Sequence, residues 1–486
     1  MNEDIYTLMP ARLWHYFGEI LLIPRPSKKE EKIAAYLLEF GKKHGLETFR
    51  DDIGNVIIRK AATAGRENIK SVVLQSHIDM VCEKNADTEH NFDEDPIEAY
   101  IEDGWVTAKG TTLGADDGIG IAAQLAILEA TNIEHGPIEC LFTIDEETGL
   151  TGAFGLDTKV LNSRILLNLD SEDDGQIFIG CAGGKDTVAE MSYQKEDVPP
   201  GYTAYKVSVT GLRGGHSGDD IQKGYGNANK ILNRALWSAA RDYGMLLSDF
   251  NAGNLRNAIA REGFAIVMLP KTNTSDFEGY VASYNDTVKS EFKVTEPALK
   301  VSFEKTDTPA FILDKITQTN LLNGIYACPH GVIAWSQDIE NFVETSTNLA
   351  SVKFKGDIIE ITTSQRSSVE SAKEDIGNMV ASTLQLARCK TRHTDGYPGW
   401  TPNPNSEIVD ITAKVYEDLF NTKPEVLAIH AGLECGLIGD KYPEMDMVSY
   451  GPTIKGAHSP DERINIETVE KFWEMTLEIL KRVPGA

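Results

Sequence analysis

The chain has 486 residues, of which 41% are hydrophobic and 25% are charged, a composition typical of a globular protein with roughly two or three domains. Its formal net charge of -27 at pH 7 argues against nucleic acid and anionic membranes as partners, because the surface field repels both. The N-terminal segment lacks the basic region of a signal peptide, no apolar run is long enough to span a membrane, and no cysteines form a CxxC pair. We therefore expect a cytoplasmic protein with reduced thiols.

The first third of the chain predicts helices followed by buried strands. Residues 13–22 have helical spacing, and Ser27, three residues before Glu30, suggests a capping box for an amphipathic helix that follows. Short apolar runs next to a helical segment are typical of an α/β domain whose sheet is at least partly parallel. The predicted strands are 55–60, 71–78, 138–144 and 164–169, and the predicted helix is 118–132.

The pattern changes near residue 184, where strands with one covered face begin to alternate with helices. After a loop rich in Pro, Gly and Asn at 391–405, buried runs return and a last helix is expected at 466–483. Between these points the expected strands are 203–212, 298–306, 349–356 and 357–367, and the expected helices are 225–244, 313–329 and 368–389.

This order predicts an α/β fold in which one domain interrupts another. The outer domain is discontinuous, at 1–184 and 394–486, with a mixed, largely parallel sheet flanked by helices. The inserted α+β domain spans 185–393.

Acidic and histidine side chains recur where predicted strands of the outer domain end or helices begin. Open α/β sheets bind ligands beyond the carboxyl ends of their strands, so we expect these side chains to converge. The residues are His77, Asp79, Asp116, Asp117, Glu146, Glu147, Asp170 and His458.

Imidazoles and carboxylates without a thiolate suit Zn²⁺, Co²⁺ or Mn²⁺. Two divalent ions balance three carboxylates and one bridging hydroxide, whereas a single ion leaves surplus negative charge, so we expect a dinuclear site. Asp116 or its neighbour Asp117 can bridge the ions from the start of a helix; spacing alone does not choose between them. The remaining ligands divide into His77 with Asp170 and Glu147 with His458.

Two further side chains have expected roles around the ions. Asp79 lies two residues after His77, on the same face of an extended strand, and can orient the imidazole. If Glu147 is a ligand, Glu146 stays free to act as general base. A glutamate pair at a strand end is usually solvent-facing when seen alone, and so the interpretation depends on the whole set.

Five motifs carry a family resemblance. They are SHIDMV, TTLGADDGIGIA, DEETGLTGA, NLDSED and KGAHSPDE, with a large insertion between the fourth and the fifth. In this order they resemble the dinuclear zinc peptidases related to aminoacylase and carboxypeptidase G2, and among them most closely the aminoacyl-histidine dipeptidases, or peptidase D.

The resemblance implies two bound metal ions, most simply Zn²⁺, with Asp116 rather than Asp117 as the bridge. It also implies a cis peptide bond between these two aspartates, Glu146 as the base and Asp79 as the residue that orients His77. The implied metal ligands are His77, Asp116, Glu147, Asp170 and His458.

The insertion resembles the family's lid or dimerisation domain, which implies a homodimer. His216 would then polarise the scissile carbonyl, from its own chain or from a partner subunit. Asn257 and Arg366 would hold substrate oxygens or the terminal carboxylate, and Gly432 would let substrate backbone approach closely. Taken singly, each of these residues also fits an ordinary loop or surface position.

The expected function is hydrolysis of dipeptides, in particular Xaa-His substrates including β-alanyl-histidine, by metal-activated water with Glu146 as base. Tripeptide aminopeptidase, carboxypeptidase and N-acyl amino acid deacylase are alternatives on the same scaffold. A non-catalytic, metal-stabilised binding protein is a further alternative, against which the unliganded base Glu146 argues.

Overall fold

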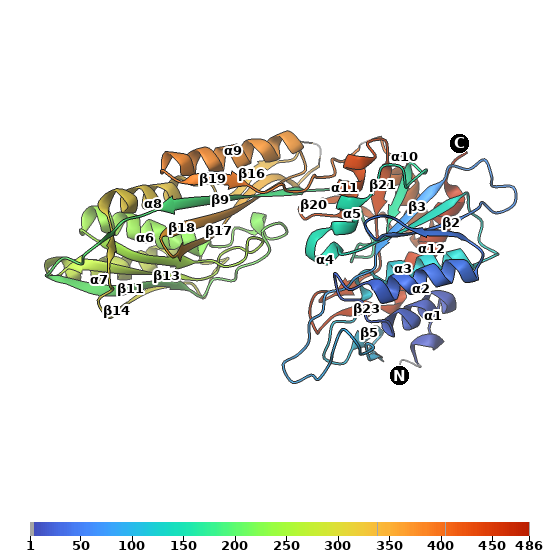
Figure 1. Ribbon diagram of the computed structural model, residues 1–486, viewed down its shortest axis with the longest axis horizontal. Coiled ribbons are helices and arrows are strands. Elements are labelled where there is room, and N and C mark those ends of the chain that lie inside the picture. Colours follow the sequence, from blue (N-terminus) through green and yellow to red (C-terminus); the bar gives the residue numbers. More distant parts are fainter. Residues whose placement is uncertain (1–3, 338, 404, 486) are drawn as a thin grey trace. The chain divides into compact units, whose positions relative to one another are not determined.

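The computed structural model describes residues 4–337, 339–403 and 405–485, and the chain divides into two compact units (Figure 1). Unit 1 comprises Met1–Gly180, Trp400–Ala428 and Leu433–Ala486, and unit 2 comprises Cys181–Gly399 and Ile429–Gly432.

The unit boundaries differ in detail from those expected, which were 184/185 and 393/394. The first crossing lies at 180/181 and the second at 399/400. The segment 429–432, placed in the outer domain by sequence, groups instead with unit 2. The backbone N–H of Ala182 lies 3.0 Å from the carbonyl oxygen of Ile429 and 3.1 Å from that of Ala431, which ties this short segment to unit 2.

The main sheet of unit 1 has the strand order β1-β2-β6-β3-β7-β21-β8-β20 and is mixed. Strand β3 pairs in parallel with both β6 and β7, and β21 pairs in parallel with β7, whereas β2 pairs antiparallel with both β1 and β6. The strands are β1 (Glu47–Arg50), β2 (Val56–Lys60), β3 (Val72–His77), β6 (Ile138–Thr143), β7 (Ile165–Asn168), β8 (Gln176–Cys181), β20 (Glu425–Ile429) and β21 (Asp446–Ser449).

The central strands explain the apolar runs in the sequence. Every residue of β3, β6 and β7 is buried, as expected for parallel strands whose two faces are both covered. Leu74 of β3 and Phe142 of β6 share one core with Phe17, Ile119 and Phe472 from the surrounding helices. The expected fold class, a mixed and largely parallel sheet flanked by helices, is confirmed.

Helices and a small second sheet complete unit 1 (Figure 1). The small sheet has the order β22-β23-β5-β4. The elements are η1 (Ile5–Thr7), α1 (Ala11–Leu21), α2 (Glu31–Lys43), β4 (Ala99–Glu102), β5 (Trp105–Ala108), α3 (Ala115–Glu129), α4 (Glu146–Gly149), α5 (Thr151–Gly155), α10 (Glu407–Phe420), α11 (Glu434–Lys441), β22 (Ile454–Lys455), β23 (Arg463–Asn465) and α12 (Ile466–Arg482).

The capping box expected before α2 is wrong. The helix begins at Glu31, and its N-cap residue Glu30 makes no side-chain capping bond. The Ser27 hydroxyl instead donates to Asp79, 2.7 Å away, so a long-range contact replaces the local one.

Unit 2 is built on a long sheet with the order β14-β11-β13-β12-β17-β18-β9-β19, and β16 pairs with β17 outside this path. Its helices lie along one face, as Figure 1 shows for α6, α8 and α9. The elements are β9 (Gly183–Ser192), β10 (Lys195–Glu196), β11 (Tyr202–Thr210), η2 (Ile221–Lys223), α6 (Ala228–Asp242), β12 (Leu246–Ala252), β13 (Gly263–Pro270), η3 (Lys271–Asn273), α7 (Thr274–Glu291), β14 (Lys300–Lys305), β15 (Ile312–Leu313), α8 (Lys315–Ala327), β16 (Gly331–Trp335), β17 (Val343–Lys355), β18 (Ile358–Ser367), α9 (Glu370–Leu386) and β19 (Lys390–His393).

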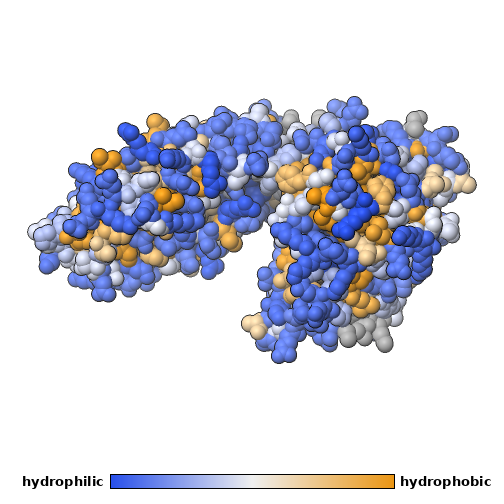
Figure 2. Space-filling view, viewed as in Figure 1, coloured by the Kyte–Doolittle hydropathy of each residue, from blue (hydrophilic) through white to orange (hydrophobic). Residues whose placement is uncertain are grey.

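The surface is largely polar. Hydrophilic residues cover most of the face seen in Figure 2. Among the described residues, none of the helices has the length and apolar character needed to cross a membrane.

A pair of phenylalanines tests the buried core of unit 1. Phe142 is fully buried in β6, whereas Phe154 of α5 is 43% exposed. We expect Phe142→Ala to lower the free energy of unfolding of unit 1 by about 3–5 kcal/mol, because it removes buried apolar surface and leaves a cavity. Phe154→Ala should change it by less than about 1 kcal/mol. Urea unfolding of both variants measures the difference, and equal effects would contradict the packing described here.

Candidate metal centre

The geometry of unit 1 brings the ends of its central strands to one edge of the sheet. Because β3 is parallel to both β6 and β7, His77 at the end of β3 lies near the turns that follow β6 and β7. Those turns present Glu146 and Glu147 at the start of α4, and Asp170 after β7. Asp116 lies in the first turn of α3, at a point where its backbone is not helical.

Two groups of potential ligand atoms meet at Asp116. The Nε2 atom of His77 lies 2.9 Å from Oδ1 of Asp116 and 3.5 Å from Oδ1 of Asp170. The Nε2 atom of His458 lies 3.3 Å from the other oxygen of Asp116, Oδ2, and 3.1 Å from Oε2 of Glu147. Within each group the ligand atoms lie within 4.8 Å of one another. The five expected ligands are therefore together, and Asp116 directs one oxygen to each group.

The chemistry of these side chains fits divalent cations. Four of the five are largely buried, with side-chain exposures of 1% for His77, 5% for Glu147, 10% for Asp170 and 11% for Asp116. The second oxygen of Glu147 is buried and accepts no hydrogen bond from the described residues. Two imidazoles and three carboxylates suit Zn²⁺, Co²⁺ or Mn²⁺, and cations between these oxygens would offset the cost of burying them.

The pKa values of the clustered side chains are shifted by burial and by their neighbours. Burial, with the nearby carboxylate of Asp116, raises the pKa of Asp170 to about 7. Burial also holds the pKa of Glu146 well above its usual range, with contributions from Asp170 and Glu147. Hydrogen bonds to Asp116 and Glu147 raise the pKa of His458 to about 11. The two carboxyl groups are thus shifted first by burial and then by neighbouring negative charge, whereas His458 is shifted by its two carboxylate partners.

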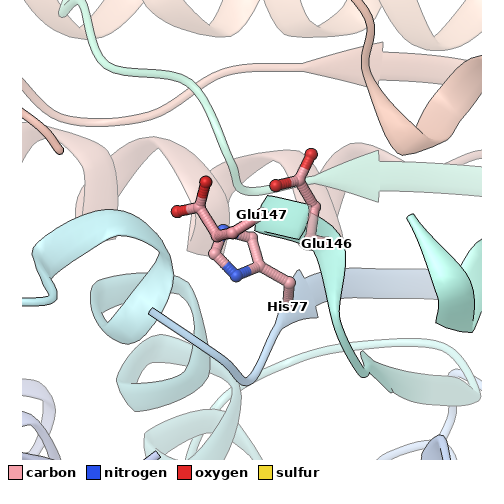
Figure 3. Close-up of side chains that lie close together, drawn as sticks. All are labelled: His77, Glu146 and Glu147. Carbon is pink, nitrogen blue, oxygen red and sulfur yellow. The ribbon is translucent and has the colours of Figure 1, made fainter. Parts of the chain in front are cut away.

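Glu146 lies beside the two groups without belonging to the five. Figure 3 shows the ring of His77 at the end of β3, with the carboxylates of Glu146 and Glu147 directed to different sides of it. Their nearest ligand atoms and that of His77 lie within 4.8 Å of one another. Glu146 is therefore close enough to act on a molecule held between the two groups.

Asp79 lies between His77 and the start of α4. One of its oxygens is 3.4 Å from Nδ1 of His77 and accepts a bond from the N–H of Glu146 at 3.0 Å. The other accepts bonds from Ser27 and from the N–H of Glu147, the latter at 3.3 Å. Burial raises the pKa of Asp79, but the nearby imidazole of His77 and the hydrogen bonds from Ser27 and Glu146 outweigh it and lower that pKa below its usual range. Asp79 thus contacts the imidazole, as expected, and also caps the helix that carries both glutamates, which sequence reasoning missed.

Glu434 is a residue beside the site that sequence reasoning missed. It is fully buried at the start of α11, where one oxygen accepts bonds from Gln75 and Thr143, both at 2.6 Å. Burial raises its pKa to about 7. The signal that could have found it is a single acidic residue in the stretch LECGLIG, which is otherwise apolar.

The other expected site residues belong to unit 2. His216 has Nε2 3.4 Å from Nη2 of Arg366 and Nδ1 3.2 Å from Oδ2 of Asp219. Arg366 is 8% exposed, and its buried Nε and Nη1 atoms donate to no acceptor in the described residues. Asn257 has an exposed side chain, and its carbonyl oxygen accepts the N–H of Ser217, next to His216.

Gly432 has a structural reason within the chain. A Cβ atom at this position would lie 2.9 Å from the ring of Tyr397, which leaves no room for a larger residue. Its expected role toward substrate backbone stays a prediction. The peptide bond between Asp116 and Asp117 is cis, and this expectation is confirmed.

Comparison with known proteins decides the family. A model of the peptidase family M20/M25/M40 matches residues 73–482. The chain belongs to this family. The resemblance seen in the motifs is confirmed, and this M20 protein is a metallopeptidase.

This M20 peptidase is similar over its full length to two dipeptidases, and it shares its fold with a third protein. The cytosol non-specific dipeptidase of Escherichia coli (strain K12) is 44% identical over 483 residues, which are 99% of this chain and 100% of the relative. The crystal structure of aminoacylhistidine dipeptidase from Vibrio alginolyticus is also 44% identical, with a TM-score of 0.92 and 100% of both chains covered. The aminopeptidase PepT from Bacillus cereus shares the fold, with a TM-score of 0.58 and 17% identity over 98% of this chain and 99% of its own.

The two groups of ligand atoms predict metal stoichiometry. We expect the purified protein to bind two divalent ions per chain. The Asp116→Ala variant should bind both ions more weakly, because Asp116 contributes to both groups. Asp170→Ala should weaken only one, by at least the roughly 10- to 100-fold that loss of a residue supporting a ligand causes. Elemental analysis and calorimetric titration with Zn²⁺ measure this, with the exposed Glu134→Ala as control. Two tightly bound ions in Asp116→Ala would contradict the bridging role.

Proposed function

We propose that this M20 metallopeptidase hydrolyses dipeptides at the edge of the unit 1 sheet. The observation that carries the proposal is Asp116, whose two oxygens face two separate groups of metal-ligand side chains with Glu146 beside them. The names of the two relatives at 44% identity, both dipeptidases, support the substrate class.

The ions are proposed to lie in the two groups, with His77, Asp116 and Asp170 holding one and Asp116, Glu147 and His458 the other. When bound, a pair of divalent ions lowers the pKa of water toward about 7 and stabilises a developing oxyanion. Their identity follows from the ligands only as far as Zn²⁺, Co²⁺ or Mn²⁺, and we propose Zn²⁺.

The protein's own groups then move the proton. Glu146 accepts a proton from the attacking water and delivers it to the amino group that leaves, as a general base and then a general acid. Asp79 holds the residues of this step in position. Its carboxylate accepts hydrogen bonds from the backbone N–H groups of Glu146 and Glu147 and contacts the ring of His77. One buried carboxylate therefore sets the position of the base and of two ligands.

Unit 2 is proposed to bind the substrate's polar ends. Arg366 has buried N–H groups without acceptors in the described part of the chain, and a carboxylate is the group that a guanidinium fork binds best. His216 is proposed to polarise the scissile carbonyl by donating to its oxygen. Its Nε2 lies 3.4 Å from Nη2 of Arg366, and because a guanidinium only donates, this contact opens when His216 donates from Nε2. Asn257, whose carbonyl oxygen accepts the N–H of Ser217 next to His216, is proposed to hold a substrate oxygen with its side chain.

Substrate preference is proposed to include Xaa-His dipeptides such as β-alanyl-histidine. The name of the Vibrio alginolyticus relative supports this, whereas the Escherichia coli relative is named as non-specific. A panel of Xaa-His dipeptides, other dipeptides, tripeptides and N-acetyl amino acids separates the proposal from aminopeptidase, carboxypeptidase and deacylase activities. Turnover confined to N-acetyl amino acids or tripeptides would refute it.

Two further proposals come with the family. We propose a cytosolic location, which the name of the Escherichia coli relative supports. We also propose a homodimer formed through unit 2, which light scattering of the purified protein measures.

The role of Glu146 predicts a separation of metal binding from turnover. Glu146→Gln should bind Zn²⁺ like the wild type but lose about 10²- to 10⁴-fold in kcat, since an amide cannot accept and return the proton. Steady-state hydrolysis of Ala-His by protein of measured metal content tests this, with the exposed Glu134→Gln as control. A metal-loaded Glu146→Gln protein with near-normal kcat would refute the assignment.

The role of Arg366 predicts a dependence on the substrate's carboxylate. Arg366→Met should lower kcat/KM for a dipeptide about 10- to 100-fold, because hydrogen bonds to charged groups contribute about 1.5–3 kcal/mol. The loss should be much smaller for the same dipeptide with a C-terminal amide. Arg241→Met, at an exposed position of α6, is the matched control. Equal losses on both substrates would show that Arg366 does not bind the carboxylate.

A further inference from the structure

Glu462 makes an unusual set of contacts with the segment that leads into α3. Its side chain is 2% exposed, and its carboxylate accepts the backbone N–H groups of four consecutive residues, 113–116. One oxygen lies 2.7 Å from the nitrogen of Leu113 and 2.9 Å from that of Gly114; the other lies 2.8 Å from that of Ala115 and 3.3 Å from that of Asp116. The carboxylate thus holds the backbone on which Asp116 stands.

These bonds replace an ordinary helix cap. The first N–H groups of any helix lack partners within the helix and are usually satisfied by a side chain just before it. Here the N-cap residue is Gly114, which has no side chain to offer, and Asp116 departs from helical geometry with φ −79° and ψ 114°. The acceptor comes instead from Glu462, four residues after His458. The loop that presents His458 is thereby attached to the loop that presents Asp116.

Arg25 holds the same segment from another direction. It is 2% exposed, and its guanidinium donates to the carbonyl oxygens of Ile78, at 3.2 Å, of Asp79, and of Gly114, at 2.5 Å. Ile78 and Asp79 directly follow His77. One buried cation therefore attaches the strand end that presents His77 to the segment that presents Asp116.

Gly114 is tightly packed between Arg25 and Glu462. Its φ is +72°, and a Cβ atom there would lie 2.7 Å from Nη2 of Arg25 and 2.9 Å from Sδ of Met80. Both polar groups of its backbone are also bonded, the N–H to Glu462 and the carbonyl to Arg25. A shift of this residue breaks contacts on both sides.

We propose that Arg25 and Glu462 are positioning residues of the metal centre, each serving one pair of ligands. Arg25 sets the position of His77 relative to Asp116, and Glu462 sets that of His458 relative to Asp116. The inference rests on the proposed role of Asp116 as a ligand of both ions. Neither side chain belongs to the two groups of ligand atoms; each acts through the backbone that carries the ligands.

The division of labour predicts selective losses of metal affinity. Glu462→Gln keeps the shape but turns an oxygen that accepts N–H groups into an amide that donates, so the ion held by Asp116, Glu147 and His458 should bind about 10- to 100-fold more weakly. Arg25→Lys keeps the charge, but one ammonium cannot replace a fork that reaches three carbonyls. It should weaken the ion held by His77, Asp116 and Asp170 by a similar factor.

The experiment is a Co²⁺ titration of the full-length protein, followed by calorimetry and by the visible absorption of the bound ion. The absorption of bound Co²⁺ depends on the geometry of its ligands. A general loss of protein stability would not change the absorption of one ion while leaving that of the other unchanged. Glu467→Gln is the matched control, because Glu467 is an exposed glutamate at the start of α12. Its titration should match that of the wild type.

Double variants identify which ion Glu462 serves. In Glu462→Gln combined with His458→Ala the losses should not add, since both changes act on the same ion, whereas Glu462→Gln combined with Asp170→Ala should lose affinity for both ions. If Glu462→Gln does not fold, Glu462→Asp keeps the charge at a shorter reach and carries the same expectation.

The outcomes separate this inference from the proposed function. If the wild type binds two ions and the folded Arg25→Lys and Glu462→Gln variants bind both as tightly, with unchanged spectra, the positioning roles are wrong and the metal centre stands. Equal weakening of both ions by each variant also refutes the division of labour. If the wild type binds no Co²⁺, the metal centre and this inference fail together.

Discussion

The structure depends on how negative charge is concentrated at one edge of the unit 1 sheet. Asp116, Glu147 and Asp170 are largely buried within reach of one another, with Glu146 beside them and two imidazoles as their neighbours. Such a cluster is costly unless cations share it, because buried carboxylates lose their hydration and repel each other. Two divalent ions carry the charge that three carboxylates and one hydroxide balance. Metal binding thus fits the fold's own electrostatics.

The fold supplies this geometry through ordinary α/β features. Parallel pairing of β3 with β6 and β7 brings three strand ends to one edge, and every residue of these strands is buried. The acidic and histidine side chains that follow the strands lie at their ends and in the turns, where they face one another. Buried groups behind the turns, among them Asp79, Glu462 and Arg25, receive or donate the backbone bonds that fix those turns. Precision at the centre comes from this supporting layer as much as from the ligands.

The sequence was a good guide to whatever depends on neighbouring residues. Buried strands, the helices beside them and the polar residues at strand ends could be predicted, because each has a local pattern of apolar spacing and turn residues. Contacts between distant segments could be predicted for the five ligands at the strand ends, but not where no motif or strand end marks them. Ser27 bonds Asp79 rather than capping α2, Glu462 caps a helix that begins at Ala115, and the segment 429–432 joins unit 2. Nothing in the local sequence distinguishes such a buried glutamate from an exposed one, since its partners are backbone groups with no residue signature.

The central claim is that the carboxylate of Asp116 joins two cations. X-ray diffraction from crystals grown with Zn²⁺, recorded on both sides of the zinc absorption edge, tests it most directly. The account predicts two anomalous peaks about 3.5–4 Å apart, one on each side of Asp116, with His77 and Asp170 at the first and Glu147 and His458 at the second. A single peak, or peaks remote from Asp116, would contradict it.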